Sequence, residues 1–174
     1  IEHIQSLISR QAIGKDDLEK LLDPAEHDDE LGRISRYRVL EFIACGGMGL
    51  VFKANDPQIN RDVCIKIMNP ALAAHPEAKM RFEREVRAAA CLHSERIVTV
   101  LEVGQHRQLP FLVMPLLAGE SLRKRLQRDR RLGPRLACRI ALQVAQGLRA
   151  AHAHGYLHRD IKPDNIWLSP DENV

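Results

Sequence analysis

Short apolar runs with the character of β-strands follow residue 36. They lie at residues 37–43, 50–53, 63–67, 97–103 and 111–114, and a glycine cluster and Asn55-Asp56-Pro57 separate the first three. Runs of this length between turn-forming residues are typical of strands joined by tight connections. We predict three consecutive antiparallel strands and two further strands.

Apolar positions at helical spacing dominate the second half of the chain. They predict helices at residues 80–92 and 135–154, and Pro134 and Gly155 stand at the two ends of the second one, where Pro and Gly are favoured. Strands in one half and helices in the other indicate the α+β class, not a regular βαβ alternation.

The N-terminal region has a different composition. Residues 1–22 predict two short amphipathic helices on either side of Gly14. Five acids and one proline crowd residues 23–30, which predicts a solvated linker and a domain boundary. The predicted organisation is an extension and linker at 1–30, followed by a domain from residue 35.

Length, charge and cysteine content restrict the function classes. The 174 residues carry a net charge of +3, too small a bias to indicate nucleic acid or an acidic membrane. No apolar run is long enough to span a bilayer, so no membrane contact is expected in this segment. The four cysteines have no C-x-x-C spacing, which indicates reduced thiols and a cytoplasmic protein. The chain begins with Ile, so we expect it to be part of a longer protein.

The glycine cluster between the first two strands is a candidate phosphate site. Gly46, Gly47 and Gly49 follow Ala44 and Cys45, and main-chain N–H groups in such a loop can approach phosphate oxygens closely. No helix follows the cluster and no Gly-Lys-Ser/Thr is present, which excludes the dinucleotide and Walker loops. A cover over a nucleotide and a tight hairpin without a ligand both remain open.

Two charged residues fall at positions that the pattern marks as apolar. Glu85 lies within the apolar arc of the helix at 80–92, and Lys66 lies in the apolar strand 63–67. An ionised side chain on a buried face is costly unless an opposite charge meets it, so the two are predicted to pair. The alternative is that both side chains extend to the edge of the sheet.

The most specific motif follows the long helix. Residues 158–165 read His-Arg-Asp-Ile-Lys-Pro-Asp-Asn, which closely resembles the catalytic loop of the eukaryotic-like protein kinases. Val63-Cys64-Ile65-Lys66 resembles the family's V-A-I-K strand, residues 81–85 its central helix, and residues 46–52 its glycine loop. The Gly-Gly-Met-Gly sequence of this loop is most similar to that of bacterial Ser/Thr kinases.

The resemblance implies a fold and a set of roles. The fold would be a five-stranded antiparallel small lobe with one helix and a hinge at 35–117, and an incomplete large lobe at 118–174. Asp160 would meet the acceptor hydroxyl, Lys162 the transferred phosphate, and Asn165 a magnesium ion. The ATP-binding residues implied are Ala44, Gly46, Gly47, Gly49, Val51, Cys64, Lys66, Glu85, Met114 and Leu116. Lys162 favours Ser or Thr over Tyr as the acceptor.

Some residues depart from the family pattern or admit another role. Ala44 replaces the first glycine of the loop, and Cys45 is an ordinary small residue or a redox-sensitive thiol. His158 belongs to the kinase motif, and His152 and His154 lie near the negative end of a helix, where cations are favoured; a zinc site is the minor alternative. The basic run 123–135 is a solvated helix face or a site for an acidic substrate or nucleic acid.

The D-F-G triad is absent from residues 166–174, so we expect little kinase activity from the 174 residues alone. We also expect the apolar stripe Ile140, Val144, Leu148 and Ala151 to stay exposed. The leading hypothesis is a Ser/Thr kinase using ATP and Mg²⁺ on protein substrates, without nucleic acid. A pseudokinase or nucleotide-binding scaffold is the alternative, and a small-molecule kinase a third. A homodimer and a membrane anchor beyond residue 174 are left open.

Overall fold

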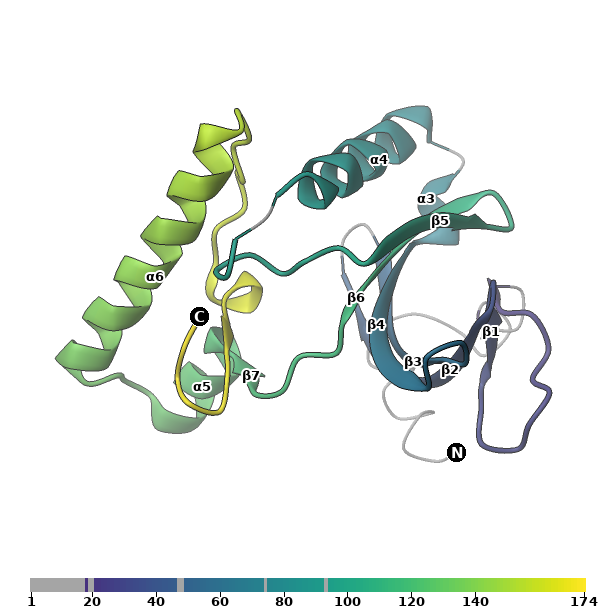
Figure 1. Ribbon diagram of the computed structural model, residues 1–174, viewed down its shortest axis with the longest axis horizontal. Coiled ribbons are helices and arrows are strands. Elements are labelled where there is room, and N and C mark those ends of the chain that lie inside the picture. The colour runs from purple at the N-terminus through teal and green to yellow at the C-terminus, as the bar shows by residue number, and fades with distance from the viewer. Residues whose placement is uncertain (1–17, 19–20, 47–48, 74, 93) are drawn as a thin grey trace. The chain divides into compact units, whose positions relative to one another are not determined.

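The computed structural model describes residues 18, 21–46, 49–73, 75–92 and 94–174. They fall into two compact units, which are described separately. Unit 1 comprises residues 1–90 and 100–116, and unit 2 comprises residues 91–99 and 117–174 (Figure 1).

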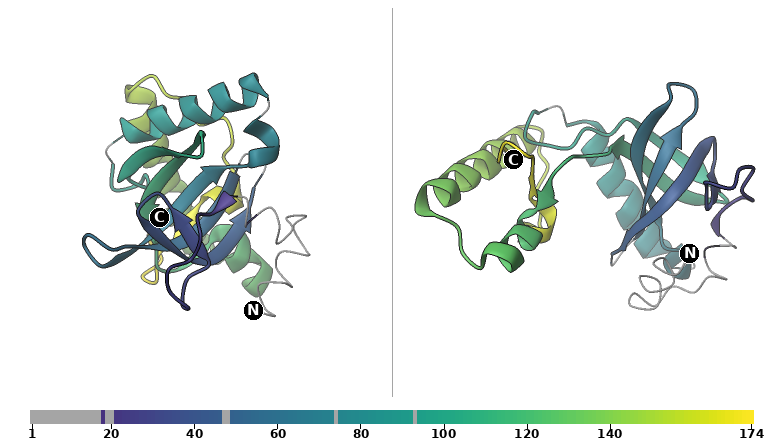
Figure 2. Two further views of the ribbon diagram at one scale, coloured as in Figure 1. Left: turned by 90° about the vertical axis from the view of Figure 1, so that its right-hand side faces the viewer. Right: turned by 90° about the horizontal axis from the view of Figure 1, so that it is seen from below.

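Unit 1 is built on an antiparallel sheet of six strands in the order β1-β2-β3-β4-β6-β5, which curls in the views of Figure 2. The strands are β1 (Gly32–Ile34), β2 (Tyr37–Cys45), β3 (Gly49–Asp56), β4 (Arg61–Met68), β5 (Glu102–His106) and β6 (Leu109–Pro115). The predicted antiparallel sheet in the strand-rich first half of the chain is confirmed. The sixth strand, β1, was not predicted, and it pairs with the start of β2.

The predicted strand at 97–103 is wrong in its position, because β5 begins only at Glu102. Arg107 and Gln108 join β5 to β6 with φ angles of 48° and 66°. Two successive positive φ angles are characteristic of the tight hairpin turn whose twist matches that of the strands. This turn sets the register between β5 and β6, in which His106 lies opposite Leu109. The pairing therefore follows the turn and not the apolar run before it.

Alternation along the strands gives the sheet two different faces. In β4, Val63, Ile65 and Ile67 are buried, whereas Cys64 and Lys66 are half-buried. Successive side chains of a strand point to opposite faces. The buried face contains aromatic side chains such as Phe42 and Phe52, whose ring centroids lie 5.5 Å apart, edge to face. The half-buried face remains for other contacts.

The segment before β1 packs against the buried face of the sheet. Leu18, Leu21 and Leu22 belong to its apolar core. The ring of His106 joins the segment to the sheet, since Nδ1 accepts from the Ser35 N–H at 3.1 Å and Nε2 lies 3.0 Å from the Leu21 carbonyl. Nε2 therefore carries the proton and donates. The helices predicted at 1–22 otherwise lie outside the described residues.

The acidic stretch 23–30 is only partly the solvated linker that its composition predicts. Most of its residues are exposed, but the side chain of Glu30 is fully buried, and it accepts from Arg33 at 3.2 Å and from Arg38 at 2.8 Å. Two guanidinium groups compensate the carboxylate for its lost hydration. Composition alone cannot identify such a pairing, because one arginine belongs to β1 and the other to β2. The predicted domain bounds themselves stay a prediction.

Two helices, α3 (Pro70–Ala73) and α4 (Pro76–Ala90), follow β4. Phe82 and Val86 of α4 form a second apolar cluster with Met68 and Leu112 of the sheet. The helix predicted at 80–92 is thereby confirmed, with an earlier start. Its packing places α4 beside the strands that carry the site.

Unit 2 contains α5 (Leu122–Asp129), α6 (Pro134–Ala153), the 3₁₀ turn η1 (Pro163–Asn165) and a two-stranded sheet of β7 (Glu120–Ser121) and β8 (Trp167–Leu168). Its core joins Leu122, Ile140 and Leu168. None of the described helices is long and apolar enough to cross a membrane.

The apolar stripe of α6 is not exposed as expected. Ile140 and Ala151 are buried, and Val144 and Leu148 are half-buried. The segment after η1 folds back on the helix, where Ile166, Leu168 and Val174 pack into the core that includes Ile140. The large apolar side chain of α6 that faces water is instead Leu142, with 60% of its surface exposed.

Candidate active site

Several of the predicted ATP-binding residues share the half-buried face of the sheet in unit 1. Val51 of β3 is directly paired with Lys66 of β4, and Cys64 is paired with Met114 of β6. Directly paired residues in an antiparallel sheet point to the same face. Cys64 and Lys66 are two positions apart, so all four residues line one surface. The sequence reasoning missed Leu112, which pairs with Lys66 and lies two positions before Met114.

The ammonium group of Lys66 lies over the ring of Phe82 of α4, 5.9 Å from its centroid. This contact places the lysine between the sheet and the helix that carries Glu85. The side chain of Glu85 is outside the described residues. The Lys66–Glu85 ion pair therefore stays a prediction.

Main-chain hydrogen bonds join the two ends of the glycine loop between β2 and β3. Gly46 and Gly49 exchange main-chain hydrogen bonds of 2.8 and 3.4 Å. A Cβ on Gly49 would lie 2.6 Å from the Ile67 carbonyl oxygen, so a larger residue would push β3 away from β4. Ala44 pairs with Val51, directly after a register shift in β2. Gly47 lies outside the described residues.

The thiols of unit 1 are poorly suited to nucleophilic chemistry. Burial raises the pKa of Cys64 to about 11 and also raises the pKa of Cys45. A thiol is reactive as the thiolate, so a raised pKa suppresses reactivity at neutral pH. This favours packing roles for both residues over a redox role for Cys45.

The predicted hinge begins at the end of β6. Met114 is half-buried, and Pro115 is paired with Val63. Leu116 follows the end of the strand and is exposed. The predicted hinge therefore lies directly after the sheet strand β6.

The three predicted catalytic residues come together in unit 2. Nζ of Lys162 lies 2.8 Å from Oδ2 of Asp160. Nδ2 of Asn165 donates to the same Oδ2 at 3.0 Å and to the main-chain oxygen of Asp160 at 2.8 Å. The Asp160 N–H donates to Nδ1 of His158 at 3.3 Å, and Arg159 between them has a φ of 60°. A non-glycine residue with a left-handed backbone conformation is strained, and such residues cluster at active sites.

The electrostatics of this loop keep Asp160 ionised. The Lys162 ammonium and the Asn165 amide hold the pKa of the Asp160 carboxyl below its ordinary value, while burial opposes them. The carboxylate is exposed, so it is accessible to an incoming hydroxyl. Its low basicity suits an acceptor of a hydrogen bond more than an early proton acceptor.

The donor chemistry of the loop fits a magnesium ion. Mg²⁺ prefers oxygen ligands from carboxylate and amide groups. The amide nitrogen of Asn165 binds Asp160, so its carbonyl oxygen is the atom with the right chemistry for a metal. Among the described residues, no group of three or more His, Cys, Asp or Glu side chains could hold a metal ion.

The carboxylate of Asp164 makes a contact that sequence reasoning missed. Arg123 of α5 donates to both its oxygens, with Nε at 3.0 Å from each and Nη2 at 2.8 Å from Oδ2. Asp164 lies inside the catalytic motif, but its partner is 41 positions away in the basic run. The sequence around either residue does not indicate that the two side chains meet.

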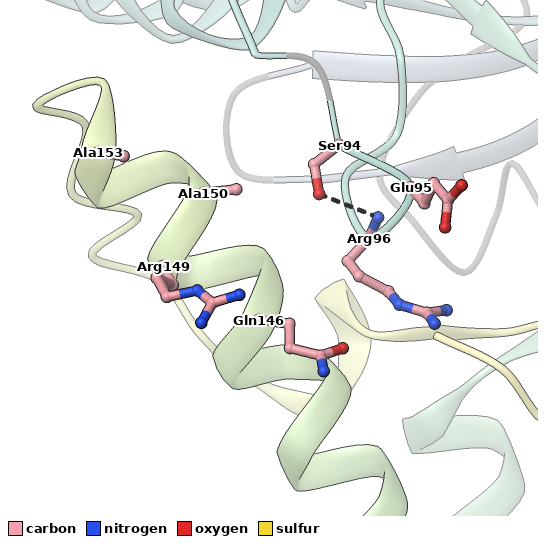
Figure 3. A pocket seen from close by; sticks show the side chains of 7 residues that line it. All are labelled: Ser94, Glu95, Arg96, Gln146, Arg149, Ala150 and Ala153. Atoms are coloured by element: carbon pink, nitrogen blue, oxygen red, sulfur yellow. Dashed lines mark hydrogen bonds between the residues drawn. The ribbon is translucent and has the colours of Figure 1, made fainter.

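A separate hollow of about 590 Å³ lies in unit 2, between the loop Ser94–Arg96 and α6 (Figure 3). Gln146, Arg149, Ala150 and Ala153 line it from the helix. It contains none of the residues assigned to ATP or catalysis and is therefore a different feature from the predicted nucleotide site.

Comparison with known proteins identifies the family. A profile of the protein kinase domain matches residues 37–174. The chain belongs to the protein kinase family. The serine/threonine-protein kinase PknB of Mycolicibacterium smegmatis is 37% identical over 143 residues, which cover 80% of this chain and 23% of that protein. PknL of Mycobacterium tuberculosis is 38% identical over 140 residues, which cover 80% of this chain and 35% of that protein.

Solved structures agree with this membership. The PknI kinase domain of Mycobacterium tuberculosis matches with a TM-score of 0.68 and 28% identity, over 85% of this chain and 60% of that one. The fold is therefore that of a protein kinase, with the small lobe and the start of the large lobe. The chain spans 23% and 35% of the length of the two named relatives and 60% of the solved domain.

Proposed function

We propose that the protein is a serine/threonine kinase that transfers the γ-phosphoryl group of ATP to hydroxyl groups of protein substrates. The observation that carries this proposal is the convergence of Lys162 and Asn165 on Oδ2 of Asp160. One carboxylate oxygen is thereby held between a cation and an amide whose own oxygen suits a metal. This is the charge arrangement that phosphoryl transfer needs, since the reaction relies mainly on positioning and electrostatic stabilisation.

The residues of unit 1 would bind the nucleotide. Val51, Cys64 and Met114 offer apolar surface for adenine, and Leu116 lies where the main chain leaves the sheet. Ala44, Gly46, Gly47 and Gly49 would cover the phosphates, and Lys66, oriented by Glu85, would neutralise the α and β phosphates. The pairing of Val51 with Lys66 gives the apolar and cationic parts of this surface a fixed spacing.

The residues of unit 2 would act on the acceptor. Asp160 accepts a hydrogen bond from the substrate hydroxyl and orients its oxygen toward the γ-phosphorus. The carboxylate then takes up the hydroxyl proton as the new bond to phosphorus forms and the bond to the leaving oxygen breaks. Lys162 offsets the negative charge of the transferred group, so its pairing with Asp160 would loosen when ATP binds. Bound magnesium, with Asn165 as one ligand, would neutralise the phosphate oxygens.

The remaining expectations depend on the whole protein. Protein substrates with Ser or Thr acceptors follow from Lys162 and from the names of the relatives. A cytoplasmic site of action and the absence of a nucleic-acid partner are part of the same proposal. A homodimer stays a prediction.

The acceptor class can be tested by incubating the full-length protein with ATP, Mg²⁺ and a mixed protein substrate, followed by phosphoamino-acid analysis. Phosphoserine and phosphothreonine are the expected products. Phosphotyrosine as the main product, or phosphorylation of added small alcohols without any of protein, would refute the proposed substrate class. Nucleotide binding without transfer would support a scaffold instead.

A further inference from the structure

Arg123 holds Asp164 from the first turn of α5. Three short donor–acceptor distances of 2.8 to 3.0 Å join the guanidinium to both carboxylate oxygens. The start of the helix is itself fixed, because the Ser121 hydroxyl accepts from the Lys124 N–H at 3.2 Å. Arginine is suited to this grip because its planar fork matches a carboxylate and restricts its orientation.

Asp164 is the middle residue of η1, directly before Asn165. The turn is closed by the Asn165 N–H, which donates to the Lys162 carbonyl at 2.9 Å. Asn165 then reaches Asp160 with two hydrogen bonds from Nδ2. A rotation of the turn at Asp164 would therefore displace the amide that holds the catalytic carboxylate.

The same end of α5 also holds the residue after Asn165. The Leu122 N–H donates to the Ile166 carbonyl at 2.8 Å. β7, directly before α5, pairs with β8 through Ser121 and Trp167. Both neighbours of Asn165 in the chain are therefore fixed by α5. The Arg123 side chain binds Asp164, and the Leu122 main-chain N–H binds Ile166.

We infer that Arg123 is a positioning residue for phosphoryl transfer, which acts through Asp164 to fix Asn165 and Asp160. This inference rests on the proposed function and adds a specific residue to it. Arg123 and Asp164 are both about half exposed, so their pair contributes little to global stability. A small misplacement of a reacting group nevertheless costs up to about 100-fold in rate. The effect should appear in turnover and not in folding.

The test compares variants of the full-length protein by their kcat and by their KM for ATP and for a protein substrate. Arg123→Ala and Asp164→Asn are each expected to lower kcat about tenfold, with both KM values within about twofold. Because each change removes the same contact, the double variant should lose little more than either one. Lys124→Ala, at the next position of the same helix, is the matched control and should retain full activity.

Rescue separates positioning from a general loss of structure. Exchange of the two charges in Arg123→Asp combined with Asp164→Arg should recover part of the kcat lost by Arg123→Asp alone. Equal loss in the Lys124→Ala control, or no recovery on exchange, would overturn the inference. A raised KM for the protein substrate with unchanged kcat would also overturn it, because Arg123 would then act on the substrate directly.

A second readout does not depend on kinase activity. Hydrogen exchange of the Asn165 main-chain amide should be faster in Arg123→Ala than in the protein without substitutions. In the control Lys124→Ala, the exchange rate at Asn165 should stay the same. If the unchanged protein transfers no phosphate, the proposed function fails, and this measurement still decides whether Arg123 fixes the turn. Unaltered exchange at Asn165 would refute the positioning role.

Discussion

Asn165 binds Asp160 twice, through the main-chain oxygen at 2.8 Å and through Oδ2 at 3.0 Å, both from the single nitrogen Nδ2. The two residues are five positions apart, and η1 between them brings the amide back to the carboxylate. The short loop is therefore preorganised by its own side chains. A preorganised site loses less energy in rearranging its dipoles during the reaction.

Replacing Asp160 by Asn should separate nucleotide binding from turnover. Asp160 is expected to meet the acceptor hydroxyl and not the adenine or the α and β phosphates. Asp160→Asn should leave the dissociation constant for ATP within about threefold and lower kcat by about 100- to 10,000-fold. Calorimetric titration and steady-state assays of the full-length protein provide the two values. Parallel losses in binding and turnover would argue against this role.

The predicted pair of Lys66 and Glu85 can be tested by a double-mutant cycle. Lys66→Met and Glu85→Ala should each reduce phosphoryl transfer by about 100-fold, since each removes half of one ion pair. Together they should lose much less than the product of the two effects. Glu77→Ala, in the first turn of the same helix α4, is the control and should be nearly neutral. Multiplicative losses would show that the two residues act independently.

Glu30 should make the stability of unit 1 depend on acid pH. Burial alone would raise its pKa, but the Glu26 N–H, Arg38 and Arg33 together lower it from 4.5 to about 2. A group with a depressed pKa stabilises the fold above its unfolded value and loses that contribution as pH falls. A difference of this size corresponds to about 3 kcal/mol, fully present above pH 4.5 and lost toward pH 2.

The measurement is the free energy of unfolding of the protein and of Glu30→Gln between pH 7 and pH 3. The variant should be destabilised by on the order of 3 kcal/mol at pH 7, and the gap should narrow below pH 4.5. Glu26→Gln, which removes an exposed partner of Arg33, is the control and should cost less than about 1 kcal/mol. A gap that is as large at pH 3 as at pH 7 would contradict the assigned pKa.

The cysteines should differ in their rates of alkylation. Cys91 and Cys138 are exposed, whereas Cys64 is half-buried with a pKa of about 11. At pH 8 only about one thousandth of Cys64 would be thiolate, so iodoacetamide should modify the two exposed cysteines at least about tenfold faster. Peptide mass spectrometry at timed intervals gives the rates. Early modification of Cys64 would show that its surroundings are more open or more polar than described.

The sequence predicted best what repeats along the chain. The short apolar run 63–67 between turn-forming residues located β4, whereas the shared face of Cys64 and Lys66 became visible only in the structure. β1 is only three residues long and has no pattern of its own, so it could not be found. The position of β5 was missed because the apolar run 97–103 lies mostly before the strand, and because Arg107 and Gln108 form the turn after the strand without a glycine or an asparagine.

The candidate site was predictable where its residues lie in one motif. Asp160, Lys162 and Asn165 are close in sequence, and η1 keeps them close in space. The contact of Arg123 with Asp164 depends on the folding of α5 against η1, and no local pattern reports it. Glu30 was assigned to a linker for the same reason, because its partners only assemble when β1 pairs with β2.

Whether the protein is a Ser/Thr kinase is decided by the rate of γ-phosphoryl transfer by the full-length protein, measured with ATP, Mg²⁺ and a Ser/Thr protein substrate. Lys66→Met is measured beside the matched control Lys53→Met, whose lysine lies on the neighbouring strand β3 and pairs with Asp62. We expect robust transfer by the unchanged protein and by Lys53→Met, and a loss of about 100-fold or more in Lys66→Met. Tight ATP binding with no transfer by the unchanged protein, or full activity of Lys66→Met, would contradict it.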